Sequence, residues 1–196
     1  WSSTVIESWK THLEAHAAVI ENGCVQHYGD PAGELAAAAT GSVFADLSQL
    51  GVIAFAGEDT ATFLQGQLTN DVREIHADAA QWSGYCSPKG RLLGNFLAWR
   101  AGDDTCLQLS GDILPSVLKR LSMFVMRAKT RARDASDEAV RLVVAGPAAA
   151  AAVEDAMGTL PQAKMKTVAT PTGTVVRVGD DKFVLVVHPE HAPAVW

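Results

Sequence analysis

Short apolar runs separated by turn-forming residues fill most of the chain from residue 42 onward, and this pattern restricts the possible folds more than any other feature. Runs of five to seven apolar residues bounded by Gly, Ser or Asp are typical of buried strands. We expect strands at 43–47, 51–57, 79–86, 91–100, 140–145, 164–169, 173–178 and 182–188. Residues 112–125 instead place Ile113, Val117 and Leu121 on one stripe, which predicts an amphipathic helix. Strand meanders mixed with isolated helices predict the α+β class.

The chain is expected to have three parts. Val5, Trp9 and Leu13 have helical spacing, so residues 1–40 are predicted to form an N-terminal helical extension. Residues 41–134 would form the first domain, and the polar stretch at 134–138 marks its end. Residues 135–196 would form a second α+β domain of ferredoxin-like type, which is truncated at its C-terminal end.

The predicted hairpin at 79–100 contains a polar residue, Asn95, on an otherwise apolar face. Ser-Pro-Lys-Gly at 87–90 suits a type I turn, and a tight turn would pair Trp82 with Asn95 and Gly84 with Leu93. A carboxamide beside an aromatic ring, with a gap left by Gly84, could bind a planar heterocycle. Alternatively, Asn95 bonds within the protein or to a buried water.

Composition and charge exclude several classes of protein. The net charge of −6 argues against a general nucleic-acid binder, which needs many Lys and Arg contacts to phosphates. One basic run lies in the segment from Lys119 to Arg133, and it is either a solvated face or an anion-facing patch. No apolar run reaches the ~18 residues that span a bilayer, so no membrane partner is expected.

Cysteine content and the two chain ends bear on compartment and completeness. The three cysteines lack metal-ligand spacing, and no other metal or catalytic residue is assigned; together with the missing leader they predict a cytoplasmic protein. Trp1 is not a natural start, and Trp196 lies in what reads as an opening helix. We therefore expect a piece of a longer protein.

Specific residue blocks point to a family. Residues 63–72 read Phe-Leu-Gln-Gly-Gln-Leu-Thr-Asn-Asp-Val, and Asp46-Leu47-Ser48, the Ser-Pro-Lys-Gly-Arg turn and Ala145-Gly146-Pro147 follow in order and spacing. From about Val43 to about His188 the chain resembles the folate-binding YgfZ family, which is related to the glycine cleavage T-protein, an aminomethyltransferase. The resemblance implies a ring-shaped, three-domain protein that holds tetrahydrofolate in a central pocket. The family's Lys-Gly-Cys-Tyr-x-Gly-Gln-Glu motif, which lies later in the family's chains, is absent from these 196 residues.

Asn95 separates two branches of this lineage. In T-proteins the strand after the turn contains an Asp that contacts folate, whereas YgfZ-like proteins typically have Asn, as here. A neutral carboxamide can orient a pterin but cannot act as an anionic proton acceptor. The resemblance therefore favours a non-catalytic tetrahydrofolate-binding protein that supports assembly or repair of iron–sulfur client enzymes, including those that modify tRNA. A folate-dependent aminomethyltransferase and a scaffold that binds no folate remain the alternatives.

The predicted folate-binding residues are Leu50, Trp82, Lys89, Arg91, Asn95 and Trp99. Lys89 and Arg91 at the turn would meet the folate glutamate tail, and the run near Arg127 and Lys129 is a second candidate for that role.

Overall fold

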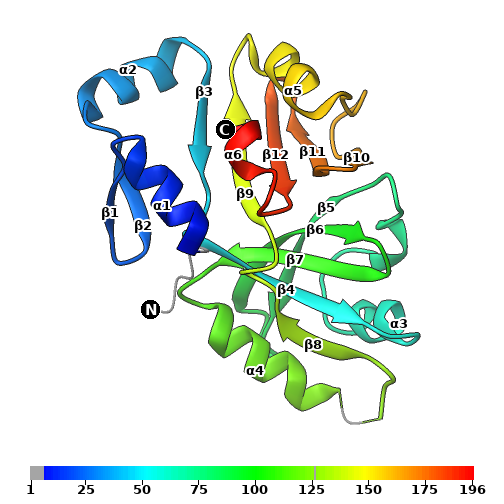
Figure 1. Ribbon diagram of the computed structural model, residues 1–196. Helices are drawn as coiled ribbons and strands as arrows, with labels where there is room; N and C mark the ends of the chain where they lie inside the picture. Colours follow the sequence, from blue (N-terminus) through cyan, green and yellow to red (C-terminus); the bar gives the residue numbers. More distant parts are fainter. Residues whose placement is uncertain (1–6, 126) are drawn as a thin grey trace. The chain divides into compact units, whose positions relative to one another are not determined.

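The computed structural model describes residues 7–125 and 127–196 (Figure 1). The chain divides into two compact units, one made of Leu50–Ser136 and the other of the segments on either side of it.

The Leu50–Ser136 unit is built on a five-stranded antiparallel sheet with the order β5-β6-β7-β4-β8. Its strands are β4 (Leu50–Ala56), β5 (Gln81–Cys86), β6 (Leu92–Ala101), β7 (Asp104–Ser110) and β8 (Arg131–Asp134). Its helices are α3 (Thr60–Gln65), the 3-10 turn η1 (Val72–Glu74) and α4 (Leu114–Phe124).

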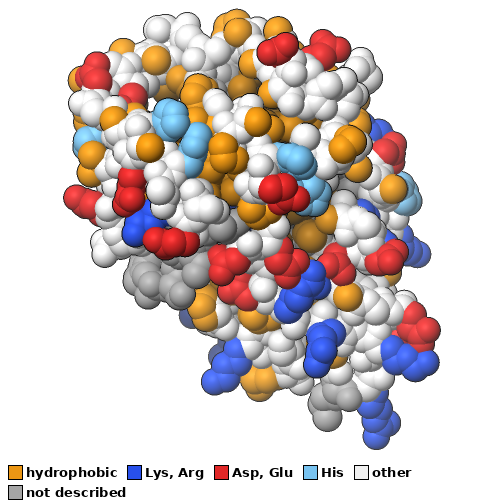
Figure 2. All heavy atoms as spheres, in the orientation of Figure 1, with side chains coloured by type: hydrophobic (Ala, Val, Ile, Leu, Met, Phe, Trp, Pro, Cys, Tyr) orange, Lys and Arg blue, Asp and Glu red, His pale blue; other side chains and the backbone are white. Residues whose placement is uncertain are grey.

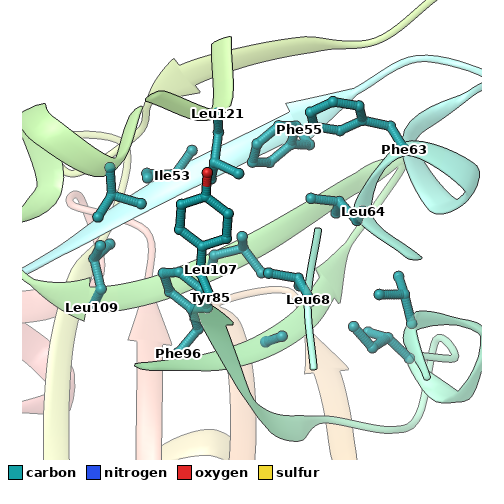
Figure 3. Packing of buried hydrophobic residues seen from close by; sticks show 14 of the residues in the cluster. Ile53, Phe55, Phe63, Leu64, Leu68, Tyr85, Phe96, Leu107, Leu109 and Leu121 are labelled. Carbon is teal, nitrogen blue, oxygen red and sulfur yellow. The ribbon is translucent and has the colours of Figure 1, made fainter. Parts of the chain in front are cut away.

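One face of this sheet packs a hydrophobic core. Leu114, Val117 and Leu121 recur along α4 at helical spacing and are buried in it, as the sequence predicts. The strands contribute residues that alternate along each strand (Figure 3), among them Ile53, Phe55, Tyr85, Phe96, Leu107 and Leu109. Because side chains alternate, the intervening residues lie on the opposite face.

The second unit contains a five-stranded antiparallel sheet with the order β10-β11-β12-β9-β3 and a separate two-stranded hairpin. The sheet strands are β3 (Val43–Asp46), β9 (Val140–Ala145), β10 (Thr167–Thr170), β11 (Gly173–Gly179) and β12 (Lys182–Val187); the hairpin is β1 (Val19–Glu21) and β2 (Cys24–His27). The helices are α1 (Glu7–Ala15), α2 (Pro31–Thr40), α5 (Ala149–Met157) and α6 (Ala192–Val195). The core of this unit includes Trp9, Leu13, Leu142, Val153 and Phe183.

The α+β class is confirmed, but the N-terminal part and the domain division differ from expectation. Helix α1 ends at Ala15, just before Ala17 adopts positive φ, and Asn22 and Gly23, also at positive φ, form the turn between β1 and β2. The structure does not place residues 41–49 with the first domain, since β3 pairs with β9 along its whole length. The described helices include none that is long and apolar enough to cross a membrane.

Candidate functional site

The β5–β6 hairpin has a different register from the one predicted. Asn95 pairs with Gly84 and Trp82 pairs with Leu97, so the predicted pairs Trp82–Asn95 and Gly84–Leu93 are wrong by two residues. The connection between paired Cys86 and Leu92 is one residue longer than a tight turn allows, and Leu93 is a bulge residue without a partner. A shift of two keeps each side chain on its original face, so Trp82 and Asn95 still share a face as diagonal neighbours.

Four predicted residues from three strands lie on this face. Directly paired residues point to the same side, and the pairs Trp82–Leu97, Leu97–Gln108, Gln108–Val52 and Trp99–Cys106 run across the sheet. By alternation Asn95 and Trp99 accompany Leu97, and Leu50 accompanies Val52. The structure thus brings Leu50, Trp82, Asn95 and Trp99 to the face opposite the core cluster. We call this the Asn95 face.

The Asn95 side chain is exposed and makes no hydrogen bond to the described residues. Trp82 is also 51% exposed, an unusual state for so large an apolar ring. An open carboxamide and an open aromatic surface are therefore neighbours on the Asn95 face.

The gap expected at Gly84 is filled. A Cβ atom on Gly84 would lie 2.9 Å from the Leu92 Cδ1 atom and 3.3 Å from the Thr69 Oγ1 atom. Gly84 therefore permits close packing of its neighbours and offers no space to a ligand.

Two buried polar atoms on the Asn95 face have no partner within the described chain. Trp99 is 1% exposed and Gln108 is 6% exposed, yet neither the Trp99 Nε1 donor nor the Gln108 Oε1 acceptor is bonded. Leaving such an atom unbonded costs about 1–3 kcal/mol, so a buried water that bonds to either atom would be favourable. Gln108 was not among the predicted residues; its signal is a single amide between Leu107 and Leu109 in an apolar strand.

Lys89 and Arg91 lie in the exposed hairpin turn, and neither makes an ion pair with the described residues. The turn is closed by the Gly90 amide donating to the Ser87 carbonyl at 2.9 Å, as a type I turn requires. The second predicted cation site is weaker, because Lys129 pairs with Glu58.

The block at 63–72 holds strand β5 in place. The Gly84 amide donates to Thr69 Oγ1 at 2.8 Å, and the Thr69 amide donates to the Gly84 carbonyl at 2.9 Å. The Val72 amide donates to Gln65 Oε1 at 2.8 Å, which closes the loop that follows α3. Because Gly84 pairs with Asn95, these bonds set the strand beside which Asn95 lies.

Asp71, the second-last residue of the block, is the N-cap of η1. Its carboxylate accepts from the Arg73 backbone amide at 3.0 Å and binds the Arg73 guanidinium at 2.6 Å. These bonds to Arg73 lower the pKa of Asp71 to about 2. Asp71 is thus a turn residue. Within the described part of the chain, no group of three His, Cys, Asp or Glu side chains could hold a metal ion.

Comparison with known proteins identifies the lineage. The model of the GCVT N-terminal domain family matches residues 25–196. The chain belongs to this family. It is 33% identical over 142 residues to the tRNA-modifying protein YgfZ of Vibrio vulnificus, which covers 72% of this chain and 42% of that protein. The YgfZ protein of Serratia proteamaculans is 28% identical over 142 residues, covering 71% of this chain and 43% of its own length. The resemblance to YgfZ proteins is therefore confirmed, and the chain spans about two fifths of the length of these relatives.

Solved structures share the fold. The glycine cleavage system aminomethyltransferase T of Bartonella henselae superposes with a TM-score of 0.80 at 18% identity, covering 99% of this chain and 57% of that protein. A heterotetrameric sarcosine oxidase from Corynebacterium gives a TM-score of 0.58 at 13% identity, covering 96% of this chain and 91% of that one. At such identities the likeness concerns the fold alone.

Proposed function

We propose that this chain is part of a non-catalytic tetrahydrofolate-binding protein, with the pterin on the Asn95 face. The observation that supports this proposal best is the exposed, unbonded carboxamide of Asn95 beside the exposed ring of Trp82. An exposed aromatic ring beside an unbonded amide offers a stacking surface and hydrogen-bonding groups in one place, and a planar heterocycle can use both.

The residues present fit a reduced folate. The carboxamide of Asn95 offers one acceptor and one donor, which match the N3–H donor and O4 acceptor of a pterin. Trp82 offers a surface for stacking, and Leu50 adds apolar contact. Lys89 and Arg91 would bind the carboxylates of the glutamate tail.

The same site residues argue against acid–base catalysis on the Asn95 face. When bound, tetrahydrofolate can supply a one-carbon unit at N5 or N10. On the Asn95 face, however, the predicted and observed site residues include no carboxylate that could accept a proton. Binding without turnover suits a supporting role.

The broader role follows from the family. Relatives are named tRNA-modifying proteins, and we propose that the folate-bound form supports assembly or repair of iron–sulfur client enzymes, including tRNA-modifying ones, in the cytoplasm. The clients would be protein partners, and no direct contact with nucleic acid is proposed.

Titration of tetrahydrofolate against tryptophan fluorescence tests the folate proposal, both for this chain and for a version extended to the length of its relatives. We expect saturable quenching that is strongly reduced in Trp82→Phe. Asn95→Ala should weaken binding about tenfold, since one or two hydrogen bonds at roughly 1 kcal/mol each are lost. Gln26→Ala removes an exposed carboxamide from β2 and should leave affinity unchanged. Absence of binding by the extended protein at millimolar ligand would remove the proposal.

An aminomethyltransferase is the second candidate, because the fold matches that of aminomethyltransferase T. A methylene-transfer assay separates the two functions. If the proposed function is correct, the native protein shows no turnover, whereas appreciable turnover that Asn95→Asp increases would favour the enzyme.

A further inference from the structure

A groove lies between α4 and the β5–β6 hairpin, within the Leu50–Ser136 unit. It has a volume of about 570 Å³ and is lined by Tyr85, Leu93, Ser116, Val117, Lys119, Arg120, Met123 and Phe124. Tyr85 belongs to the core cluster and Leu93 packs against it, so the groove is on the opposite side of the sheet from Asn95. It is therefore separate from the proposed folate site, and an inference drawn from it does not depend on folate binding.

The C-terminal end of α4 leaves two large apolar side chains exposed at this groove. Helix α4 buries Leu114, Val117 and Leu121, whereas Met123 is 64% exposed and Phe124 is 51% exposed. Single exposed apolar residues are ordinary, but adjacent ones at a groove are typical of protein docking sites. Met is also flexible enough to adapt to the surface of a partner.

The wall of the groove also contains two cationic side chains. Lys119 makes no ion pair with the described residues, and the Arg120 Nε donates to the neutral Tyr85 hydroxyl at 3.1 Å. The Tyr85 ring stands within the core with its hydroxyl directed toward α4 (Figure 3). Both cations thus remain available to an incoming carboxylate.

The Leu50–Ser136 unit is less acidic than the remainder of the chain. Residues 50–136 contain ten Lys and Arg and nine Asp and Glu, whereas the remainder of the chain contains six and thirteen. Figure 2 shows several Lys and Arg side chains, with hydrophobic ones beside them, in the lower part of the view that Figure 1 assigns to α4 and β8. Outside Lys119 and Arg120 the unit holds eight basic and nine acidic residues, so the preference for an acidic partner rests on these two side chains of the groove wall.

We propose that this groove docks an acidic amphipathic helix of a partner protein. Large apolar residues of that helix, spaced three or four apart, would enter between Met123, Phe124 and Leu93, and flanking Glu or Asp would pair with Lys119 and Arg120. A concave wall fits a helical ridge better than the flat surface of a bilayer, and its apolar lining does not suit a phosphate backbone. A second copy of the chain meeting the groove with the same face would place Lys119 and Arg120 against like charges, which disfavours self-association there.

Selection from a displayed library of random peptides, about 16 residues long, on the immobilised chain tests the proposal, since helices near this length become stable on docking. We expect enriched peptides to combine Glu or Asp with large apolar residues at helical spacing. Their affinity should fall about tenfold or more for the double variant Met123→Ser with Phe124→Ser, and about threefold for Lys119→Glu. Lys119→Glu should also gain affinity for versions of the same peptides in which Lys replaces Glu.

Matched variants separate docking from unfolding. Lys182→Glu reverses an exposed charge on β12, and Ser122→Ala alters an exposed α4 residue outside the groove; both should bind like the parent. Enrichment of basic peptides, or binding that ignores the groove variants while their circular dichroism is native, would overturn the proposal. So would groove-dependent binding to vesicles of anionic lipid, because it would assign the groove to a membrane.

Discussion

Asp46, the acidic residue of the Asp-Leu-Ser block, has a clear structural role. It is 7% exposed, and its carboxylate accepts from the Trp9 Nε1 at 2.8 Å and from the Ser48 amide at 2.9 Å. A buried carboxylate is tolerated only when donors surround it. Burial of the phenol raises the pKa of Tyr28, and the nearby carboxylates of Asp46 and Glu34 raise it further. One side chain of a family block thus connects α1 to β3, and it needs no ligand to explain its presence.

Replacing Trp9 by Phe should destabilise the protein. The change keeps most of the apolar contact and removes the Nε1 donor, leaving the buried Asp46 carboxylate with one bond fewer. Hydrogen bonds to charged groups are worth about 1.5–3 kcal/mol, so we expect a loss of about 2 kcal/mol in the free energy of unfolding. Urea unfolding followed by circular dichroism measures it. Trp82→Phe, at an exposed site, should change the free energy by less than about 0.5 kcal/mol; equal losses in the two variants would refute the role given to the Asp46–Trp9 bond.

At the scale of elements, the block at 63–72 acts as a clamp on β5. Thr69 bonds Gly84 through both its backbone and its hydroxyl, and Leu68 forms an isolated bridge to Tyr85. The block therefore extends the edge of the sheet beyond β5 and fixes the strand that faces Asn95. Its position in the fold shows how residues that do not lie on the Asn95 face can still fix the strand beside Asn95.

Thr69→Val tests the clamp. Valine has nearly the shape of threonine but lacks the oxygen that accepts from the Gly84 amide, so that amide loses its partner. The expected loss is about 1–3 kcal/mol of unfolding free energy. Amide hydrogen exchange should show faster exchange at Gly84, while exchange in the other unit is unchanged. Thr62→Val, an exposed substitution on α3, is the control; if its effect equals that of Thr69→Val, the clamp is not supported.

The elements that sequence reasoning predicted well are those with strong local periodicity. Strands β4, β9, β11 and β12 and helix α4 follow their apolar patterns closely, because burial dictates those patterns. The β1–β2 hairpin was missed, since residues 19–27 are mostly half-exposed and alternate weakly. Helix α2 agrees with the helical extension predicted for residues 1–40, and Asp30 caps it by accepting from the Gly33 amide at 3.0 Å.

The sequence predicted which residues share the Asn95 face, but it did not predict the pairing register between the strands. Alternation along the strands placed Trp82, Asn95 and Trp99 on one face whatever the register, which is why that part survives the two-residue shift. The bulge at Leu93 has no local signal, so the pairing could not be derived. Gln108 comes from a strand that only the long-range register brings beside Leu97.

At the scale of the whole molecule, charge is divided unevenly along the chain. The segments outside residues 50–136 hold thirteen of the acidic and six of the basic residues. The dependence of stability on pH is expected to come from individual groups whose pKa differs between the folded and the unfolded chain. Two such groups are His12 in α1 and Asp71 before η1, and their ordinary pKa values of 6.5 and 3.8 lie in different pH ranges.

Stability should fall in two steps as the pH decreases. Burial of the imidazole, with the neighbouring His16, lowers the pKa of His12 below its usual 6.5, so the unfolded chain binds a proton more readily than the folded one. By linkage, stability is complete above pH 6.5 and decreases as the pH falls through the lowered pKa of His12. The pKa of Asp71 is lowered from 3.8 to about 2, so a second, smaller loss is expected between these values, weakened by solvent screening of the exposed Asp71–Arg73 pair.

Urea midpoints measured from pH 8 to pH 3 test the first step. His12→Asn should flatten the dependence just below pH 6.5, because the asparagine does not titrate. His76→Asn removes one exposed histidine from the other unit and should leave the slope unchanged. The two histidines differ in surroundings, since the His12 ring stacks on Trp9 at a centroid distance of 5.1 Å and its Nε2 is buried without a partner among the described residues. A parent protein whose stability rises as the pH falls from 6.5 to 5 would show that His12 is instead stabilised in its charged form, and the stacked arrangement on α1 would then need a different explanation.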